Sequence, residues 1–260
     1  MAATRARDPR LDAFRGLALV MILIDHMPGN PYEHVTYRNI GFSDAAEAFF
    51  VLSGIAAGLA YSGRFLPEQR ARAGLWAAVA PMWKRAWTLY LVHLMLTLWV
   101  IAIFAGAADV FGDPAYLRMH NLRGVFTNPS EVIFGIVTLG HQIGYVNILP
   151  VYSLLLLFAP LAMLGACRHP WATLAVSAAI WFIAGNWRIN LPNYPEGGVW
   201  FFDPMCWQLI FVVGLVTGTA MRRGERLVPV RRDLFALAAG WLLLVLAWRM
   251  IPPLAEVLNH

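Results

Sequence analysis

The sequence predicts an all-α protein, a polytopic bundle of transmembrane helices, and three observations support that fold class. Hydrophobic residues make up 59% of the 260 residues and charged residues only 13%, about half the charged share of ordinary soluble domains. The mean hydropathy is +0.58. Apolar runs of about 20 residues, the length that crosses a bilayer, recur along the chain. We therefore expect most of the surface to face lipid.

About seven apolar segments are long enough to be spans. They lie at 11–27, 44–62, 86–106, 146–166, 170–187, 204–221 and 234–251. Residues 75–85 form an amphipathic lead-in to the third span. Residues 130–145 are too short to cross the bilayer and suit a re-entrant or interfacial helix. We expect residues 1–260 to form a single membrane-embedded domain.

The basic residues predict the orientation of the chain. With a cytoplasmic N-terminus, fourteen of the twenty Lys and Arg residues fall in cytoplasmic segments and only four in outer segments, as the positive-inside rule requires. The outer four are Arg38, Arg118, Arg123 and Arg188. The larger outer loops are then about 28–43, 107–145 and 188–203. This charge pattern explains the net charge of +5 without nucleic acid, and the long outer loops suggest a substrate on that face.

Two ionisable side chains share one face of the first span. Arg15 and His26 are eleven residues apart, which is about 20° from three complete helical turns and about 16 Å along the axis. Asp12 lies one turn before Arg15, close enough to pair with it. Asp25 places a carboxylate beside His26, and a histidine near a carboxylate is a candidate general base. Alternatively, Arg15 and Asp12 are an interfacial ion pair and His26 only ends the helix.

The second span contains one acidic residue that needs a partner. Glu47, Gly54 and Gly58 fall on one helix face. The Gly54 to Gly58 spacing permits close helix packing, and Asp44 suits a helix N-cap. Glu47 on that inward face must pair, be protonated or meet water.

Further polar residues gather at the outer ends of later spans. His141, Asp203 and Gln208 are each explained singly as loop residues satisfied by water, and Trp207 as an interface anchor. Together they could line an outer cavity. His93, inside the third span, is interpreted as a satisfied contact between helices. No GxxxxGK[ST], HExxH or CxxC motif is present, so nothing supports nucleotide hydrolysis, zinc proteolysis or dithiol chemistry, and no metal site is expected.

Several stretches resemble the OpgC family of bacterial membrane acyltransferases, within the wider acyltransferase-3 grouping. DPRLDAFRGLALVMILIDHMP and FSDAAEAFFVLSG are similar to the start of that family, and NILPVYSLLL and FFDPMCWQLIFVVG are similar to later blocks. The grouping's mark, Arg or Lys followed by ten residues and His, corresponds to Arg15 and His26. Family members usually have about ten spans, so the chain is expected to be short relative to the family.

The resemblance implies an O-acyltransferase of EC class 2.3.1 in the bacterial inner membrane. It would move a succinyl or acetyl group from cytoplasmic acyl-CoA, a substrate rather than a bound cofactor, to an extracytoplasmic glycan such as periplasmic glucan. His26 would act as general base or transient acyl carrier, with Glu47 or Asp25 setting its basicity. Donor binding would fall to Arg15 and Asp12. Acceptor binding would fall to Asp203, Trp207, Gln208 and His141. Proteins of glucan synthesis are a candidate class of partner.

Two other functions remain open from the sequence. Buried Arg, Asp, Glu and His residues also form proton relays in transporters, so a transporter or flippase of a glycan or acyl precursor is the alternative. A non-catalytic docking subunit is a third. Only an enzyme would consume acyl-CoA in liposomes.

Overall fold

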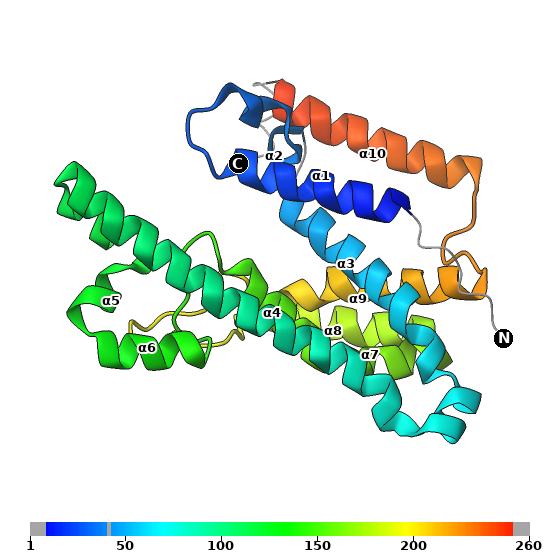
Figure 1. The fold of residues 1–260 in the computed structure, drawn as a ribbon. Helices are drawn as coiled ribbons and strands as arrows, with labels where there is room; N and C mark the ends of the chain where they lie inside the picture. The colour runs from blue at the N-terminus through cyan, green and yellow to red at the C-terminus, as the bar shows by residue number, and fades with distance from the viewer. Residues whose placement is uncertain (1–8, 41–42, 252–260) are drawn as a thin grey trace. The chain divides into compact units, whose positions relative to one another are not determined.

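The computed structural model describes residues 9–40 and 43–251, and nearly all of its regular structure is helical (Figure 1). The α-helices are α1 (Pro9–Asp25), α2 (Tyr37–Ile40), α3 (Ala45–Tyr61), α4 (Pro67–Phe111), α5 (Arg123–Thr127), α6 (Pro129–Val137), α7 (Ile148–Arg168), α8 (Pro170–Trp187), α9 (Pro204–Arg223) and α10 (Arg232–Met250). Three 3-10 helices are η1 (Pro31–Val35), η2 (Ser62–Phe65) and η3 (Pro114–Asn121). Within the described ranges the only β pairing is a bridge between Pro192 and Val199.

Each of the seven predicted spans overlaps a helix, and the third, 86–106, is only part of α4. Five helical segments are long and apolar enough to cross a membrane, namely α3 with η2, α4, α7, α9 and α10. This supports the all-α membrane fold class. Because α1 and α8 fall outside that set, the number of spans stays a prediction.

The chain divides into two compact units. One comprises residues 1–60 with 213–260, and the other comprises residues 61–212. Two compact units can belong to one domain, so the prediction of a single membrane-embedded domain stays a prediction.

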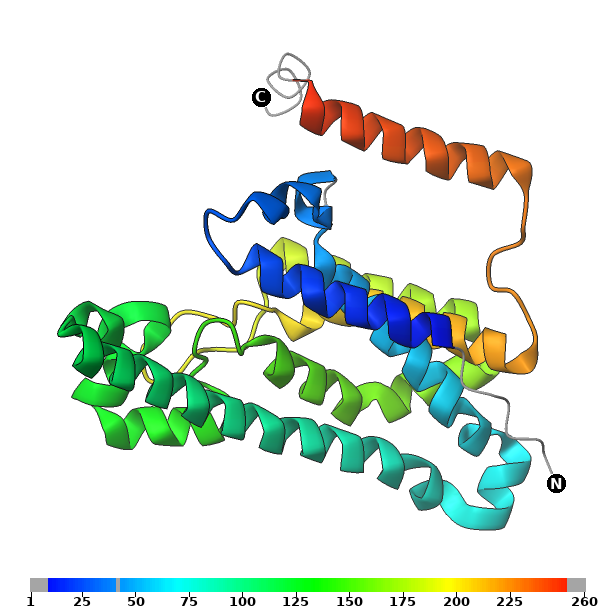
Figure 2. The ribbon, with the colours of Figure 1, turned by 45° about the horizontal axis from the view of Figure 1, so that its top comes forward.

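α4 organises the second unit. Gly74 lies in the left-handed region at φ 80° and kinks the helix, and the residues after it extend for about 55 Å, longer than a bilayer core. α7 runs beside α4 (Figure 2), and the Trp83 indole donates to the Leu157 carbonyl at 2.9 Å. The nine-residue α6 is only about 13 Å long, too short to span, as predicted for this segment. The Tyr90 hydroxyl donates to Val137, the last residue of α6, at 2.8 Å.

Close glycine packing joins α3 to the second half of α9 in the first unit. A Cβ added to Gly58 would meet Leu215 and Thr219 backbone atoms. A Cβ added to Gly214 or Gly218 would clash with α3 backbone oxygens. The Gly54 to Gly58 pattern on α3 was predicted to permit such packing, whereas the Gly214 to Gly218 pattern on α9 was missed.

Candidate functional site

The polar residues of the first helix lie on its covered side. Asp12, Arg15, Ile22 and Asp25 are partly buried, and Ala18, in the same stripe, is fully buried. The spacing of three or four residues places all five on one face. The opposite, exposed face carries apolar side chains such as Phe14 and Leu19. A bilayer tolerates ionisable groups only where protein or water surrounds them, so this stripe is the candidate site.

Arg15 and Asp12 form the predicted pair. Arg15 Nη1 lies 4.0 Å from Asp12 Oδ1, one helical turn away. The Arg15 Nε is buried and makes no hydrogen bond within the described part of the chain. The Asp12 contact therefore leaves part of the guanidinium unsatisfied.

Asp25 is held by a residue that the sequence did not reveal as important. The Thr36 hydroxyl lies 2.6 Å from Asp25 Oδ1 and 2.8 Å from the Glu33 carbonyl oxygen. Thr36 is only 1% exposed, and η1 places it back against the end of α1. A donor within hydrogen-bond distance of a carboxylate fixes its orientation.

His26 lies in the turn that follows α1, and its side chain is exposed. Its Nδ1 lies 2.6 Å from the Ile22 carbonyl oxygen. A carbonyl oxygen only accepts hydrogen bonds, so Nδ1 carries the hydrogen. In the neutral ring the basic lone pair is then on Nε2. The Ile22 backbone thus selects the tautomer, and the effect of Asp25 or Glu47 on the basicity of His26 stays a prediction.

Glu47 has a local partner of its own. Its Oε2 accepts from the Asp44 backbone N–H at 2.8 Å, and Asp44 Oδ1 accepts from the Ala46 N–H at 2.6 Å. This reciprocal arrangement is a capping box at the start of α3. It confirms Asp44 as the N-cap and gives Glu47 a structural role beside its predicted chemical one.

Three of the four predicted acceptor-binding residues lie around the start of α9. Asp203 Oδ1 accepts from the Met205 N–H at 2.8 Å. The Trp207 ring packs edge-on against Phe202, with centroids 4.8 Å apart. Gln208 exchanges two hydrogen bonds with Ser177 of α8, at 2.6 and 2.8 Å. Each has a structural function, and their role in binding an acceptor stays a prediction.

His141 lies in a different place, the loop between α6 and α7. It is 3% exposed, and its Nε2 is 3.0 Å from the Asn121 carbonyl oxygen. The Asn121 side chain in turn donates to the Gln142 carbonyl at 3.2 Å. These bonds tie the loop to the end of η3.

His93 was interpreted as a satisfied contact between helices, and the backbone beside its ring is that of a loop residue, Val146. His93 is 0% exposed, and neither ring nitrogen makes a well-aligned hydrogen bond, although the Val146 backbone lies close to the ring. Thr97, one turn later, is 1% exposed, and its hydroxyl also lacks a partner among the described residues. The sequence predicted that His93 and Thr97 lie on one helix face, but not whether the loop facing them offers hydrogen-bond partners.

These features define a helical, membrane-spanning protein with ionisable residues on the covered face of its first helix. A family model described as OpgC protein matches residues 7–259. The chain therefore belongs to the OpgC family, and membership suggests an acyltransferase-like role for a membrane protein. Comparison with curated proteins and with solved structures gives no match.

Proposed function

We propose that the protein transfers an acyl group, succinyl or acetyl, from cytoplasmic acyl-CoA to a hydroxyl of an extracytoplasmic glycan such as periplasmic glucan. Family membership supports the reaction class. The distribution of basic residues supports the direction, because it assigns Arg15 to the cytoplasmic side of α1 and His26 to the outer side. The expected location is the bacterial inner membrane.

The hydrogen bond between His26 and Ile22 is the observation that carries the proposal. It assigns the hydrogen to Nδ1 and therefore the basic lone pair to Nε2, in a residue at the predicted outer end of a helix. An acceptor glycan arrives at that side. A base of the right tautomer at the right end of the helix is what acylation of an external hydroxyl requires.

The reaction is a single acyl transfer. His26 Nε2 removes the proton of the acceptor hydroxyl as its oxygen attacks the thioester carbonyl. The carbon–oxygen bond forms, the carbon–sulfur bond breaks, and the proton passes to the departing CoA thiolate. Asp25, fixed by Thr36, favours the imidazolium that forms in between. Arg15, beside Asp12, receives CoA phosphates at the cytoplasmic side.

Glu47 and the α9 residues have supporting roles in this proposal. Glu47 holds the start of α3 through its bond to Asp44. The acceptor sugar is bound by Asp203, Trp207, Gln208 and His141 in this proposal, beside the local contacts that each residue makes.

The test replaces His26 by alanine and measures acyl transfer to glucan in membranes with matched protein levels. General-base catalysis contributes about 10²–10⁴-fold, so we expect a loss of that size. His34→Ala, which removes a nearby histidine in η1, should retain full activity. Full transfer by the His26 variant would contradict the proposal.

A second measurement separates the enzyme from a transporter or flippase. Purified protein in liposomes should release free CoA thiol from acyl-CoA only when a glycan acceptor is present. Glycan movement without release of CoA thiol would favour the transporter.

A further inference from the structure

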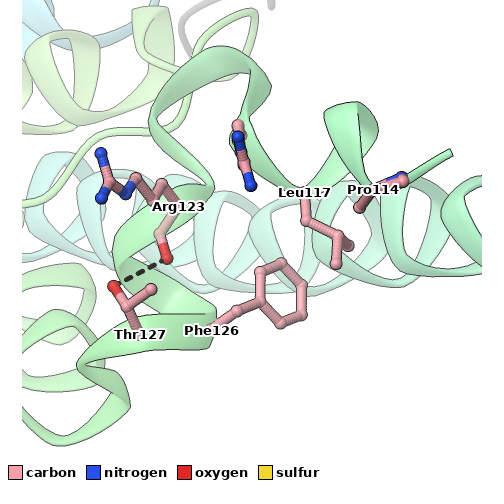
Figure 3. Close-up of a pocket in the computed structure, with 6 residues that line it drawn as sticks. Pro114, Leu117, Arg123, Phe126 and Thr127 are labelled. Carbon is pink, nitrogen blue, oxygen red and sulfur yellow. Dashed lines mark hydrogen bonds between the residues drawn. The ribbon is translucent and has the colours of Figure 1, made fainter.

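A pocket in the outer segment after α4 is separate from the residues discussed so far. Its cavity volume is about 340 Å³, within the range of ligand pockets, about 300–1,000 Å³. Its lining comes from η3 and α5 alone: Pro114, Leu117, Arg118, Arg123, Phe126 and Thr127. Figure 3 shows Leu117 and Phe126 on one side and Arg123 with Thr127 on the other.

The pocket contains two arginines, although basic residues are rare in the predicted outer segments of this chain. Only four basic residues fall in predicted outer segments, and Arg118 and Arg123 are two of them. Both side chains are exposed. In the described ranges no carboxylate lies within 4.0 Å of either guanidinium. Their hydrogen-bond donors are therefore available to a ligand.

Three carboxylates lie near the pocket, and two of them accept hydrogen bonds from other groups. Asp113 accepts from the Ala115 N–H at 2.8 Å, which caps η3. Glu131 accepts from the Asn128 amide at 2.7 Å. Glu196 lies against the backbone of Gly124. None of the three forms an ion pair with the pocket arginines, and the charged side chains among the lining residues are both arginines.

We propose that this pocket binds an oxyanion, a carboxylate or phosphate, carried by a ligand at the outer face. Guanidinium groups recognise such groups through paired hydrogen bonds. Phe126 and Leu117 offer an apolar wall for the ring or chain that carries the anion. The Thr127 hydroxyl donates to the Arg123 carbonyl at 3.1 Å, which fixes the turn that presents the arginine. The anion comes either from an acidic saccharide or from a lipid headgroup.

The experiment measures binding by the full chain in nanodiscs, which expose both faces and need no acyl transfer. One arm titrates glucose 6-phosphate, with glucose as neutral control, into protein in phosphatidylcholine nanodiscs. The other adds phosphatidylglycerol and counts retained lipids by native mass spectrometry. The variants are Arg118→Gln, Arg123→Gln and both together. Arg188→Gln is the matched control, an exposed outer arginine outside the pocket.

We expect each pocket variant to weaken binding about tenfold and the double variant about a hundredfold, with no change for Arg188→Gln. Loss of glucose 6-phosphate binding identifies a soluble saccharide anion, and loss of phosphatidylglycerol retention identifies a lipid headgroup. The proposal is overturned if neither anion binds wild type more tightly than the double variant. Equal loss in Arg188→Gln overturns it as well. Equal binding of glucose and glucose 6-phosphate overturns it when the double variant also retains as much phosphatidylglycerol as wild type.

Discussion

Thr36 shows how a residue outside the membrane helix can control a group at its end. It follows Asp25 by eleven residues, is almost fully buried, and its hydroxyl is within donating distance of the Asp25 carboxylate. A hydrogen bond to a charged group contributes about 1.5–3 kcal/mol. Without that bond, the Asp25 carboxylate loses a donor that fixes its orientation, so in the proposed mechanism its effect on His26 depends on Thr36.

Thr36→Val should therefore lower kcat for acyl transfer about tenfold, with KM little changed, because the donor to Asp25 is lost while the shape is kept. Steady-state kinetics in membranes at matched expression would measure this. Thr36→Ser keeps the hydroxyl and should restore most of the activity. Equal kcat for the valine variant and wild type would mean that Asp25 orientation does not matter.

Single residues differ in how far the sequence predicts them. Asp44 was predictable as an N-cap because capping is local, and its bond to Ala46 confirms it. The Gln208 bonds to Ser177 span 31 residues and depend on how α8 and α9 pack. His93 was placed correctly inside a helix, but the loop facing it supplies no aligned partner. Hydrogen bonds between residues close in sequence could be predicted, whereas those between distant residues depend on how the helices pack.

Among the helices, the glycines of α3 and α9 determine how closely two spans approach. Gly218 faces the Ile55 carbonyl and Gly214 faces the Val51 carbonyl, so backbone meets backbone. Small residues in such positions stabilise helix pairs in lipid through van der Waals contact. Added side-chain atoms would force the helices apart.

Gly218→Ala should destabilise the protein by about 1–3 kcal/mol, because the new Cβ would clash with the Ile55 carbonyl. The apparent Tm in detergent should fall by about 2–4 °C for each kcal/mol. Gly240→Ala on α10 is the matched control, since a Cβ there meets nothing within 4 Å. Its Tm should stay equal or rise slightly. Equal Tm changes in both variants would argue against close α3–α9 packing.

The apolar runs of the sequence predicted where the long helices lie, but they did not predict how long each helix is. The predicted third span, 86–106, forms only part of α4, because the amphipathic residues 75–85 continue the same helix from the kink at Gly74. Amphipathic residues signal an interface in the sequence, although the backbone can remain helical through it.

For the whole molecule, the distribution of arginines makes a prediction about the two faces of the membrane. Fourteen basic residues on one side and four on the other are expected to orient the chain during insertion. The proposed direction of acyl transfer depends on that orientation.

Two cysteine variants, Glu196→Cys and Glu225→Cys, test the predicted orientation of the chain. Both positions are exposed and lie in loops on opposite predicted faces of the membrane. The background replaces Cys167 and Cys206 by alanine, since both are thiols outside any disulfide in the described residues and could react with the label. A membrane-impermeant maleimide added to spheroplasts should label Glu196→Cys immediately and Glu225→Cys only after lysis. The reverse pattern would invert the orientation and with it the direction of transfer.

The short helix α6 has a consequence for biosynthesis. It is too short to be inserted as a span, and the backbone after it depends on partners made at different times. Tyr90, which binds Val137, has already left the ribosome when α6 emerges. Tyr194, whose N–H donates to the Gly140 carbonyl at 3.0 Å, is synthesised only after α7 and α8. This stretch of chain is therefore expected to reach its final form only after α7 and α8 have been synthesised, when Tyr194 becomes available to bind Gly140.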